Sequence, residues 1–551
     1  MDRKLPPKGL IRLYRESLLQ NWDLSMFSDY DGASYRYGEV AQMIHQLHLF
    51  FQSSGIQKGD KIALLGRNSS RWGITFLATI SYGAVAVPIL PDFNPADIHH
   101  IIKHSESKLI FAADGLFDKL TIDELEKVQC ILSLNSFKLL YDKNDTGKVF
   151  WKQSLKAGAV SPILPENFSL DDLYNEEICI LSYTSGTSGF TKGVMIPVRS
   201  LLSNIIFARE HMPLKKGDKI VSFLPMSHVF GLLFEFLFPA TVGCHITFLS
   251  KSPTPQIIIK AFGEIQPHLI LSVPLVIEKI YKKQILPTLE KPAIKFLMKV
   301  PGISSILRKK IKEKLVETFG GRFHEIVIGG APLSKEVEVF FKMIDFPFTI
   351  GYGMTECGPL ISYDAWNTTH TSSAGKLVDR MQVRIDSADP FREVGEIQVK
   401  GMHVMQGYYK NDEATQQSMT ADGWLRTGDL GLIDSQNYVY IKGRCKNMLL
   451  GPSGQNIYPE EIEAKLSNLS GILETVVIER DGKLIALVYP DPEISETEKM
   501  NEVALARLME ENRRLINHEL PKYSQIIKIE LVNEEFEKTP KRNIKRYLYT
   551  Q

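Results

Sequence analysis

The feature that most constrains the fold of this chain is the alternation of short apolar runs with helix-like segments between Lys61 and Ala112. Apolar runs at 61–65, 84–87 and 109–112 read as strands, and the segments 69–82 and 95–104 between them read as helices. This βαβαβ order favours a mostly parallel sheet with helices on both faces. A second such unit runs from a strand at 325–328, through a helix starting near Ser334, to a strand at 348–350. We therefore predict an α/β fold.

Glycine-rich turns follow both strands of the second unit, at 329–332 and at 351–356. Ligands of open α/β sheets bind beyond the carboxyl ends of the strands. Either turn alone could equally be an ordinary turn in which glycine adopts the left-handed conformation. Together with the polar segment 184–193 they form three walls of one predicted crevice.

The segment Tyr183–Gly193 combines small hydroxylated residues and glycines with a single lysine, Lys192. Glycines let the main chain approach a ligand, and hydroxyl and backbone N–H groups donate to phosphate oxygens. A flexible Ser/Gly linker is the alternative, but strands at 177–183 and 193–197 flank the segment, and a helix at 200–211 follows. The phosphate loop of kinases and GTPases has adjacent Gly and Lys and opens directly into a helix, so this loop is of another kind.

Composition limits the other function classes. With 551 residues, 44% of them hydrophobic, the chain is long enough for more than one domain. The formal net charge of +1 gives no reason to expect a nucleic-acid partner. The longest apolar region, 229–242, is interrupted by Glu235 and Pro239, and residues 1–7 lack the apolar run of a signal peptide. Five scattered cysteines fit free thiols in a reducing compartment. We therefore predict a cytoplasmic protein.

The pattern changes beyond Asp434. A strand at 438–443 is followed by a polar stretch, a helix at 459–468, a hairpin that joins 474–480 to 483–489, and a long helix near 495–519. These elements make a unit of ordinary domain size. The predicted division is residues 1–443, a hinge at 444–447, and residues 448–551.

Five blocks, taken together, resemble the adenylate-forming enzymes, which include acyl-CoA synthetases, luciferases and the adenylation domains of peptide synthetases. The blocks are 183–193, 351–356, 424–429, 443–446 and 456–462. The resemblance implies a large N-terminal domain of mixed sheets flanked by helices, with a small mobile α+β C-terminal domain. It also implies two half-reactions: a carboxylic acid attacks the α-phosphorus of ATP to give an acyl-adenylate and pyrophosphate, and a thiol, that of coenzyme A, then displaces AMP.

The resemblance also assigns roles to residues. The β- and γ-phosphates are held by Thr184, Ser185, Gly186, Thr187, Ser188 and Lys192. Glu356, with Thr184, is the Mg²⁺ ligand, since Mg²⁺ prefers one or two carboxylates besides phosphate oxygens and water. Tyr352 stacks on adenine, which Gly330, Ala331 and Pro332 border, and Gly351, Gly353 and Met354 complete that turn. Thr355 reaches the α-phosphate, and Lys192, Thr355 and Glu356 are the expected catalytic groups of this crevice.

Asp429 is expected to accept both ribose hydroxyls, with Arg444 nearby; the alternative is an ordinary turn residue in Thr427-Gly428-Asp429. Lys446 falls at the family's hinge, where rotation of the backbone would swing the small domain. After that swing the turn 451–454 would face the site and Gly454 would help to form the thiol tunnel. A surface hairpin is the alternative for this turn.

One departure from the family pattern lies near the C-terminus. The pattern is Thr-Pro-x-Gly-Lys-Ile-x-Arg, and here the stretch 539–546 places Asn543 at the lysine position. Three interpretations are open: Lys541 or Lys545 replaces that lysine, the first half-reaction is slowed, or activity is specialised or lost. We favour replacement by Lys541, because long ammonium side chains reach several ångströms, and count it with the catalytic residues.

The segment that lines the acid pocket in similar enzymes is here His228, Val229, Phe230 and Gly231. It contains no aspartate to pair an α-ammonium group, and its apolar character suits an alkyl or aryl chain. His228 would close the pocket or orient the carboxylate, or else is simply packed. The stretch 291–314 is basic and amphipathic. It fits an anionic membrane surface, an acidic acyl carrier protein, or an ordinary solvated helix face.

These observations lead us to predict an ATP-dependent ligase that joins a medium- or long-chain fatty acid to coenzyme A and uses Mg²⁺. A ligase that loads acyl carrier protein is the first alternative, and a non-catalytic nucleotide- or acyl-binding homologue is the second. The predicted location is cytoplasmic, with peripheral contact to the inner membrane surface as an alternative.

Overall fold

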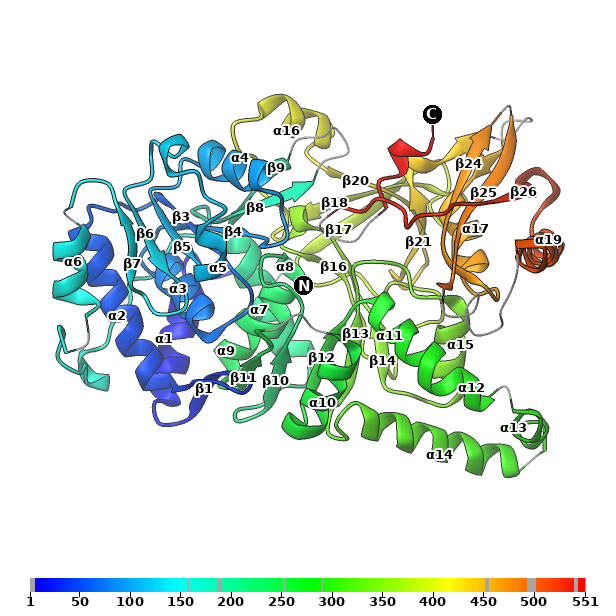
Figure 1. The fold of residues 1–551 in the computed structure, drawn as a ribbon, viewed down its shortest axis with the longest axis horizontal. Coiled ribbons are helices and arrows are strands. Elements are labelled where there is room, and N and C mark those ends of the chain that lie inside the picture. Colours follow the sequence, from blue (N-terminus) through cyan, green and yellow to red (C-terminus); the bar gives the residue numbers. More distant parts are fainter. Residues whose placement is uncertain are drawn as a thin grey trace.

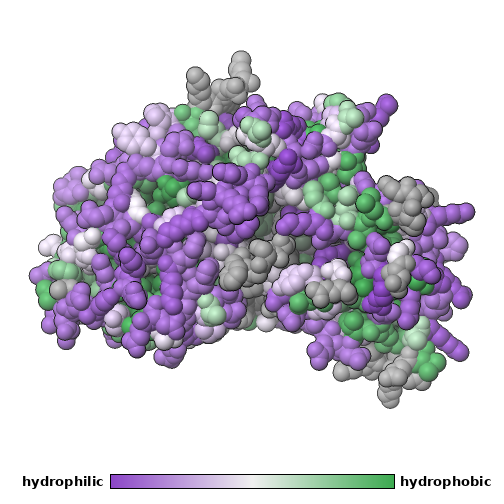
Figure 2. Space-filling model, turned by 90° about the horizontal axis from the view of Figure 1, so that it is seen from above, coloured by the Kyte–Doolittle hydropathy of each residue, from purple (hydrophilic) through white to green (hydrophobic). Residues whose placement is uncertain are grey.

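The computed structural model describes residues 5–145, 147–156, 158–185, 191–250, 254–289, 291–300, 302–450, 455–480, 482–492, 502–539 and 544–550. Figure 1 shows the N-terminal elements on the left, the elements from β12 to α15 at the lower right, and the C-terminal elements at the upper right. Figure 2 shows one face of the molecule, which is covered mainly by hydrophilic side chains, with hydrophobic ones more frequent on the right.

The largest sheet has eight strands in the order β19-β9-β8-β4-β3-β5-β6-β7. The five strands from β8 to β6 are parallel, whereas β19, β9 and β7 pair antiparallel at the two edges. The strands are β3 (Lys61–Leu65), β4 (Val85–Ile89), β5 (Leu109–Ala112), β6 (Cys130–Ser133), β7 (Leu139–Asp142), β8 (Ile178–Ser185), β9 (Thr191–Pro197) and β19 (Gly407–Tyr408). The predicted βαβαβ unit is confirmed.

Helices cover both faces of this sheet. Ile62 and Leu64 of β3 belong to one hydrophobic cluster, and Ala63 and Leu65 belong to another. Successive side chains of a strand point to opposite faces, so the two clusters lie on opposite sides. The first cluster includes residues of α2 (Tyr37–Ser53) and α3 (Ser70–Ser81), and the second includes residues of α4 (Pro95–Ser105). Burial on both faces explains why these strands read as continuous apolar runs.

Three further sheets complete the larger part of the chain. The first has the order β10-β11-β1-β2, the second is the parallel β12-β13-β14, and the third is the antiparallel β17-β18-β20-β21. The strands are β1 (Ser25–Asp29), β2 (Ser34–Arg36), β10 (Lys219–Ser222), β11 (His245–Phe248), β12 (Leu269–Ser272), β13 (Glu325–Ile328), β14 (Phe348–Ile350), β17 (Met381–Asp386), β18 (Gly395–Gly401), β20 (Leu425–Ile433) and β21 (Val439–Arg444), with the small pair β15 (Tyr352–Gly353) and β16 (Leu360–Ser362).

The remaining α-helices of this part connect and cover these sheets. They are α1 (Leu10–Gln20), α5 (Asp114–Phe117), α6 (Gly147–Ser154), α7 (Val198–His211), α8 (Val229–Gly231), α9 (Phe238–Val242), α10 (Pro255–Ile265), α11 (Pro274–Ile280), α12 (Leu286–Leu289), α13 (Pro292–Leu297), α14 (Ile303–Thr318), α15 (Lys335–Met343) and α16 (Asp412–Ser418). Two π-helical turns, Leu232–Leu237 and Tyr281–Ile285, join α8 to α9 and α11 to α12.

The apolar stretch 229–242 is a core element. All six residues of its π-helical turn are buried, and its phenylalanines belong to the main hydrophobic cluster. None of the helices in the described part of the chain combines the length and the apolarity needed to cross a membrane. The five cysteines are free thiols, as predicted.

The C-terminal elements have their own sheet, in the order β24-β25-β26. Its strands are β24 (Ile472–Arg480), β25 (Lys483–Pro490) and β26 (Ile526–Leu531), next to the ribbon of β22 (Leu449–Leu450) and β23 (Asn456–Ile457) and the helices α17 (Pro459–Leu466) and α19 (Glu502–Glu519). The predicted hairpin is confirmed. Two hydrophobic clusters consist entirely of residues between 449 and 549, whereas the main cluster contains no residue after Ile441 among those described.

Candidate active site

The predicted phosphate loop connects two antiparallel strands, as expected. Thr184 of β8 lies opposite Lys192 of β9, and Ser185 lies opposite Thr191. The predicted residues Gly186, Thr187 and Ser188 lie outside the described residues. Thr184 and Lys192 therefore mark the base of the loop, at the carboxyl end of β8.

Tyr408 connects this hairpin to a segment far away in the sequence. It lies on β19, the short strand that pairs with β9. The ring centroid of Tyr408 is 5.1 Å from the Nζ atom of Lys192, and its hydroxyl donates a hydrogen bond of 2.8 Å to Oε1 of Glu356. Burial raises the pKa of the Tyr408 hydroxyl, so this group keeps its proton and remains a donor. Lys192, Glu356 and Tyr408 are thus brought to one place.

The turn that carries Thr355 and Glu356 is fixed by backbone contacts. The N–H of Met405 donates to the carbonyl of Glu356 at 2.7 Å, and the N–H of Met354 donates to the carbonyl of Pro359 at 2.9 Å. A Cβ atom on Gly353 would come within 2.1 Å of that same carbonyl oxygen, so only glycine fits there. Asn204 of α7 is buried under the turn. Its side chain donates to the carbonyl of Cys357 at 3.3 Å and accepts from the N–H of Leu360 at 3.2 Å.

Tyr352, Asp429 and Arg444 form a second group. The Tyr352 hydroxyl donates to Asp429 at 2.6 Å, and Nε of Arg444 lies 2.8 Å from the other carboxylate oxygen of Asp429. Asp429 on β20 and Arg444 on β21 are direct cross-strand partners. Burial raises the pKa of the Asp429 carboxyl, and Arg444 acts against that rise. The predicted adenine-stacking and ribose-binding residues are therefore neighbours, with Arg444 beside them as expected.

The two glycine-rich turns lie side by side, because β13 and β14 are parallel neighbours. The N–H of Gly351 donates to the carbonyl of Ile328 at 2.9 Å. Gly330 has a φ of 85°, in the left-handed region that favours glycine. Ala331 and Pro332 are exposed at the rim. The two glycine-rich turns thus follow neighbouring parallel strands, at the carboxyl ends where the crevice is predicted.

The predicted acid-binding segment reaches the first of these turns. A Cβ atom on Gly329 would come within 3.1 Å of the Phe230 ring, and that ring meets Phe234 edge-on at 5.8 Å. His228 and the buried Val229 stand at the start of α8. Gly231 packs so closely on the Leu224 carbonyl that a Cβ atom would lie 3.0 Å from its oxygen.

Two buried polar residues hold the loop that precedes His228. The carboxyl of Glu235 accepts the N–H groups of Phe223 and Leu224, each at 3.0 Å. Asn68 accepts the N–H of Met226 at 2.9 Å and donates to the carbonyl of Leu224 at 2.7 Å. Burial raises the pKa of Glu235 well above its ordinary value, and the two backbone N–H groups act against that rise.

The C-terminal tail folds back on itself. Lys538 and Ile544 form an antiparallel bridge. Lys538 pairs with Glu474 at 2.5 Å, Lys545 with Glu537 at 3.0 Å, and Arg546 with Glu463 at 2.5 Å. Lys541, Asn543 and Gly454 lie outside the described residues. Lys446 stands in a short turn after β21 and is exposed.

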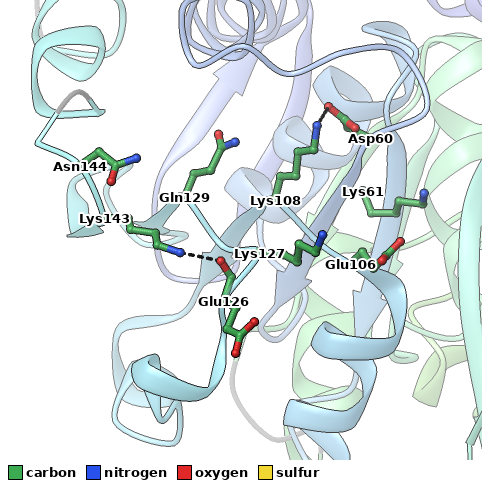
Figure 3. A pocket seen from close by; sticks show the side chains of 9 residues that line it. All are labelled: Asp60, Lys61, Glu106, Lys108, Glu126, Lys127, Gln129, Lys143 and Asn144. Carbon is green, nitrogen blue, oxygen red and sulfur yellow. Dashed lines mark hydrogen bonds and ion pairs between the residues drawn. The ribbon is translucent and has the colours of Figure 1, made fainter.

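A surface hollow of about 380 Å³ lies elsewhere, at the amino ends of β3, β5 and β6. Figure 3 shows its mixture of lysines and acidic residues. Lys108 pairs with Asp60 at 2.7 Å, and Lys143 donates to the carbonyl of Glu126 at 2.6 Å. Lys108 and Asp60 thus form an ion pair within the hollow, which lies at the amino ends of its strands and not at the carboxyl ends, where the crevice is predicted.

Sequence reasoning missed Tyr408, Asn204, Asn68 and Glu235. Glu235 was noticed only as an interruption of an apolar run, which in fact signalled a buried carboxyl with backbone partners. Tyr408 had no local signal, since a two-residue strand has no periodicity. The resulting arrangement brings a lysine and a half-buried carboxylate together around Tyr408. Such groups can align an anion with a polyphosphate and offset developing charge.

Comparison with known sequences gives one family match and many relatives. The sequence model of a family described as "AMP-binding enzyme" matches residues 17–409. The long-chain-fatty-acid–CoA ligase FadD15 of Mycobacterium bovis is 28% identical over 482 residues, which cover 83% of this chain and 77% of that protein. The long-chain-fatty-acid–CoA ligase ACSBG2 of Rattus norvegicus is 26% identical over 490 residues, with 84% and 72% covered.

Solved structures share the fold. ATP-bound MatB from Rhodopseudomonas palustris superposes with a TM-score of 0.75 at 20% identity, covering 98% of each chain. The anthranilate CoA ligase AuaEII, in complex with anthranoyl-AMP, gives a TM-score of 0.78 at 18% identity, covering 99% of this chain and 97% of that one. The predicted fold class is confirmed by these likenesses.

Proposed function

Because this chain belongs to the AMP-binding enzyme family, we propose that it is an ATP-dependent acid–thiol ligase. It activates a medium- or long-chain fatty acid as acyl-AMP, with release of pyrophosphate, and transfers the acyl group to coenzyme A. Relatives named long-chain-fatty-acid–CoA ligases, from a bacterium and a mammal, match more than four fifths of the chain and support this choice. The apolar surroundings of Phe230 suit an alkyl chain.

The observation that carries the proposal is the convergence of three distant segments on one point. Tyr408 from β19 contacts both other segments. Its ring centroid lies 5.1 Å from Nζ of Lys192 in the β8–β9 hairpin, and its hydroxyl lies 2.8 Å from Oε1 of Glu356 in the second glycine-rich turn. A cation and a carboxylate held by the same aromatic side chain are what a magnesium–polyphosphate group requires. A structural ion pair would instead bring Lys192 and Glu356 into direct contact.

The residues present fit Mg²⁺ and ATP. The Tyr408 hydroxyl donates a hydrogen bond to Oε1 of Glu356. No hydrogen bond from the described residues reaches Oε2, so Oε2 is available to a metal ion. Bound Mg²⁺ would neutralise phosphate charge. Glu356 would hold it, together with Thr184, and Lys192 would contact the phosphates beside the loop 184–188. Thr355 follows Met354 at the start of the same short turn and would contact the α-phosphate.

The nucleoside end fits the second group of residues. Asp429 would accept the two ribose hydroxyls, and the Arg444 guanidinium 2.8 Å away lowers the pKa of its carboxyl, which burial raises. The hydroxyl of Tyr352 is held by Asp429, which fixes the ring in one orientation. That ring would stack on adenine, with Gly330, Ala331 and Pro332 along its edge and Gly351 and Gly353 behind it.

We place the domain boundary at residues 444–447, with Lys446 as the hinge. The separate hydrophobic clusters on either side of this segment support the division. Polar contacts cross between the two parts; for example, the Ser334 hydroxyl donates to Asn468 at 2.6 Å and Lys282 donates to the carbonyl of Ser467 at 3.0 Å. Such an interface permits relative motion.

The proposal is tested by a panel of carboxylic acids in the presence of ATP and Mg²⁺. Acid-dependent exchange of labelled pyrophosphate into ATP measures the first half-reaction, and AMP release after addition of coenzyme A measures the second. We expect both, with apolar acids preferred. Absence of exchange with every acid would favour the alternative of a non-catalytic binding protein. The loss of activity would then be explained by Asn543, which stands where the family pattern has a lysine. Release of AMP with acyl carrier protein but not with coenzyme A would instead identify a carrier-loading ligase.

A further inference from the structure

The basic stretch singled out in the sequence forms a projecting corner of the molecule. Figure 1 shows α14 along the lower edge and α13 at its outer end. The inner end of α14 is anchored, because Leu315 is buried and the Phe319 ring lies 6.1 Å from Phe262 of α10. None of the described residues of the outer half of α14, 303–310, is buried. We call residues 291–312 the α13–α14 corner.

Large apolar side chains are exposed on this corner. Phe296 is 69% exposed, Ile306 is 60% exposed and Ile303 is 44% exposed. Ile303 and Ile306 are three residues apart in one helix and therefore share a face. Single exposed apolar residues are ordinary, but a group of large ones surrounded by polar residues marks an interaction surface.

The charge of the corner has one sign. Residues 291–312 contain seven lysines and arginines and no acidic residue, although the whole chain has a net charge of only +1. Lys312 pairs with Asp345 at 2.8 Å. Lys291, Lys299, Lys309 and Lys310 make no ion pair with any residue of the described ranges. Positive charge without internal partners, next to exposed apolar side chains, is the composition of a peripheral membrane contact.

We propose that the α13–α14 corner docks on an anionic lipid bilayer. Phe296, Ile303 and Ile306 enter the boundary between headgroups and acyl chains, and the lysines face the lipid phosphates. An acidic carrier protein would also meet the lysines, but three large apolar side chains at a projecting tip favour the bilayer. The biological purpose rests on the proposed function, since long-chain acids partition into membranes. The docking itself does not depend on catalysis.

The position of the corner suits delivery of such an acid. The α13–α14 corner belongs to the connection between β12, which ends at Ser272, and β13, which begins at Glu325. β13 in turn leads into Gly329, against which the Phe230 ring packs. The proposed membrane contact and the proposed acid-binding segment are therefore both connected to β13.

The test is flotation of the full-length protein with vesicles of phosphatidylcholine alone and of phosphatidylcholine mixed with phosphatidylglycerol. We expect binding to the anionic vesicles only, weakened by salt. The double variant Lys309→Gln, Lys310→Gln should bind about thirtyfold more weakly, since each basic residue near an anionic surface contributes about fivefold. Phe296→Ser should lose about tenfold or more through the missing apolar contact.

Matched controls lie elsewhere on the surface. Phe391 is 59% exposed and Lys483 is exposed, so Phe391→Ser and Lys483→Gln remove the same groups outside the corner. These variants should bind vesicles like the unchanged protein. Pyrophosphate exchange with a water-soluble acid and no vesicles should be equal in all variants, which separates docking from catalysis. Equal binding to both vesicle types, unchanged binding of the corner variants, or capture of an acidic carrier protein with no vesicle binding would each overturn the proposal.

Discussion

Removal of one hydroxyl group, in Tyr408→Phe, tests the proposed site most directly. The variant keeps the ring that faces Lys192 and removes only the donor to Oε1 of Glu356, a hydrogen bond of 2.8 Å. Hydrogen bonds to charged groups contribute about 1.5–3 kcal/mol. Tyr408 is 9% exposed, so water does not easily take the place of the hydroxyl. If this interaction positions Glu356 for a metal ion, kcat/KM for the first half-reaction should fall about 10- to 160-fold.

The assay is acid-dependent pyrophosphate release at a series of Mg²⁺ concentrations. We expect Tyr408→Phe to need more Mg²⁺ for half-maximal rate, because Glu356 is no longer held in place. The neighbouring Tyr409 offers a matched control, since its hydroxyl makes a longer contact of 3.4 Å with Glu106. Tyr409→Phe should leave the Mg²⁺ dependence unchanged. A Tyr408→Phe enzyme with the original kcat/KM and Mg²⁺ dependence would refute the reasoning.

Three further predictions follow. Asp429→Asn keeps the shape of the side chain but removes its charge, so the KM for ATP should rise about tenfold or more while the KM for the acid stays the same. Steady-state kinetics with each substrate varied would measure both values. An unchanged KM for ATP would mean that Asp429 is only a turn residue. Burial raises the pKa of Glu325 to about 7. The folded chain therefore binds that proton more tightly than the unfolded chain, and stability should fall by up to about 3 kcal/mol as pH rises from about 4.5 to above 7. Melting temperatures measured across this range should show a smaller slope for Glu325→Gln, and an equal slope would assign the dependence to other groups. Lys541→Ala should slow pyrophosphate release without an equal effect on thioester formation, whereas Lys545→Ala should change neither much, because Lys545 is paired with Glu537 at 3.0 Å; full adenylation in both variants would remove the idea that a nearby lysine replaces the missing one.

Much of the fold follows from the sequence because its parallel strands are buried on both faces. The predicted bounds of β3, β5, β13 and β14 agree with the structure to the residue. Such strands appear as uninterrupted apolar runs, which helices and glycines then separate. The predicted helix near Ser334 begins at Lys335, directly after it. The two glycine-rich turns were predictable for the same reason, since they end these strands.

The remaining features depend on contacts between segments far apart in the chain. Tyr408 reaches Glu356 across 52 positions, and Asn204 reaches Cys357 across 153. Neither partner carries a local signal of the other. Glu235 shows the same difficulty within a short range, because its partners are backbone N–H groups, which every residue has. A buried polar side chain in an apolar run indicates that such a partner exists, but only the folded chain shows which one.

The absent lysine at Asn543 is best understood from how the tail is held. Lys538 and Arg546 are anchored to Glu474 and Glu463 inside the C-terminal elements. The hydrogen bond with Glu537 raises the pKa of Lys545, and Asp97 of α4 adds to that effect, so this lysine is already engaged by acidic groups. In the sequence, residues 539–543 lie between these anchors. Lys541 is the one lysine in this stretch of sequence, next to Arg542, so the proposal that a nearby lysine replaces the missing one falls on Lys541, two positions before the residue that the family pattern leads one to expect.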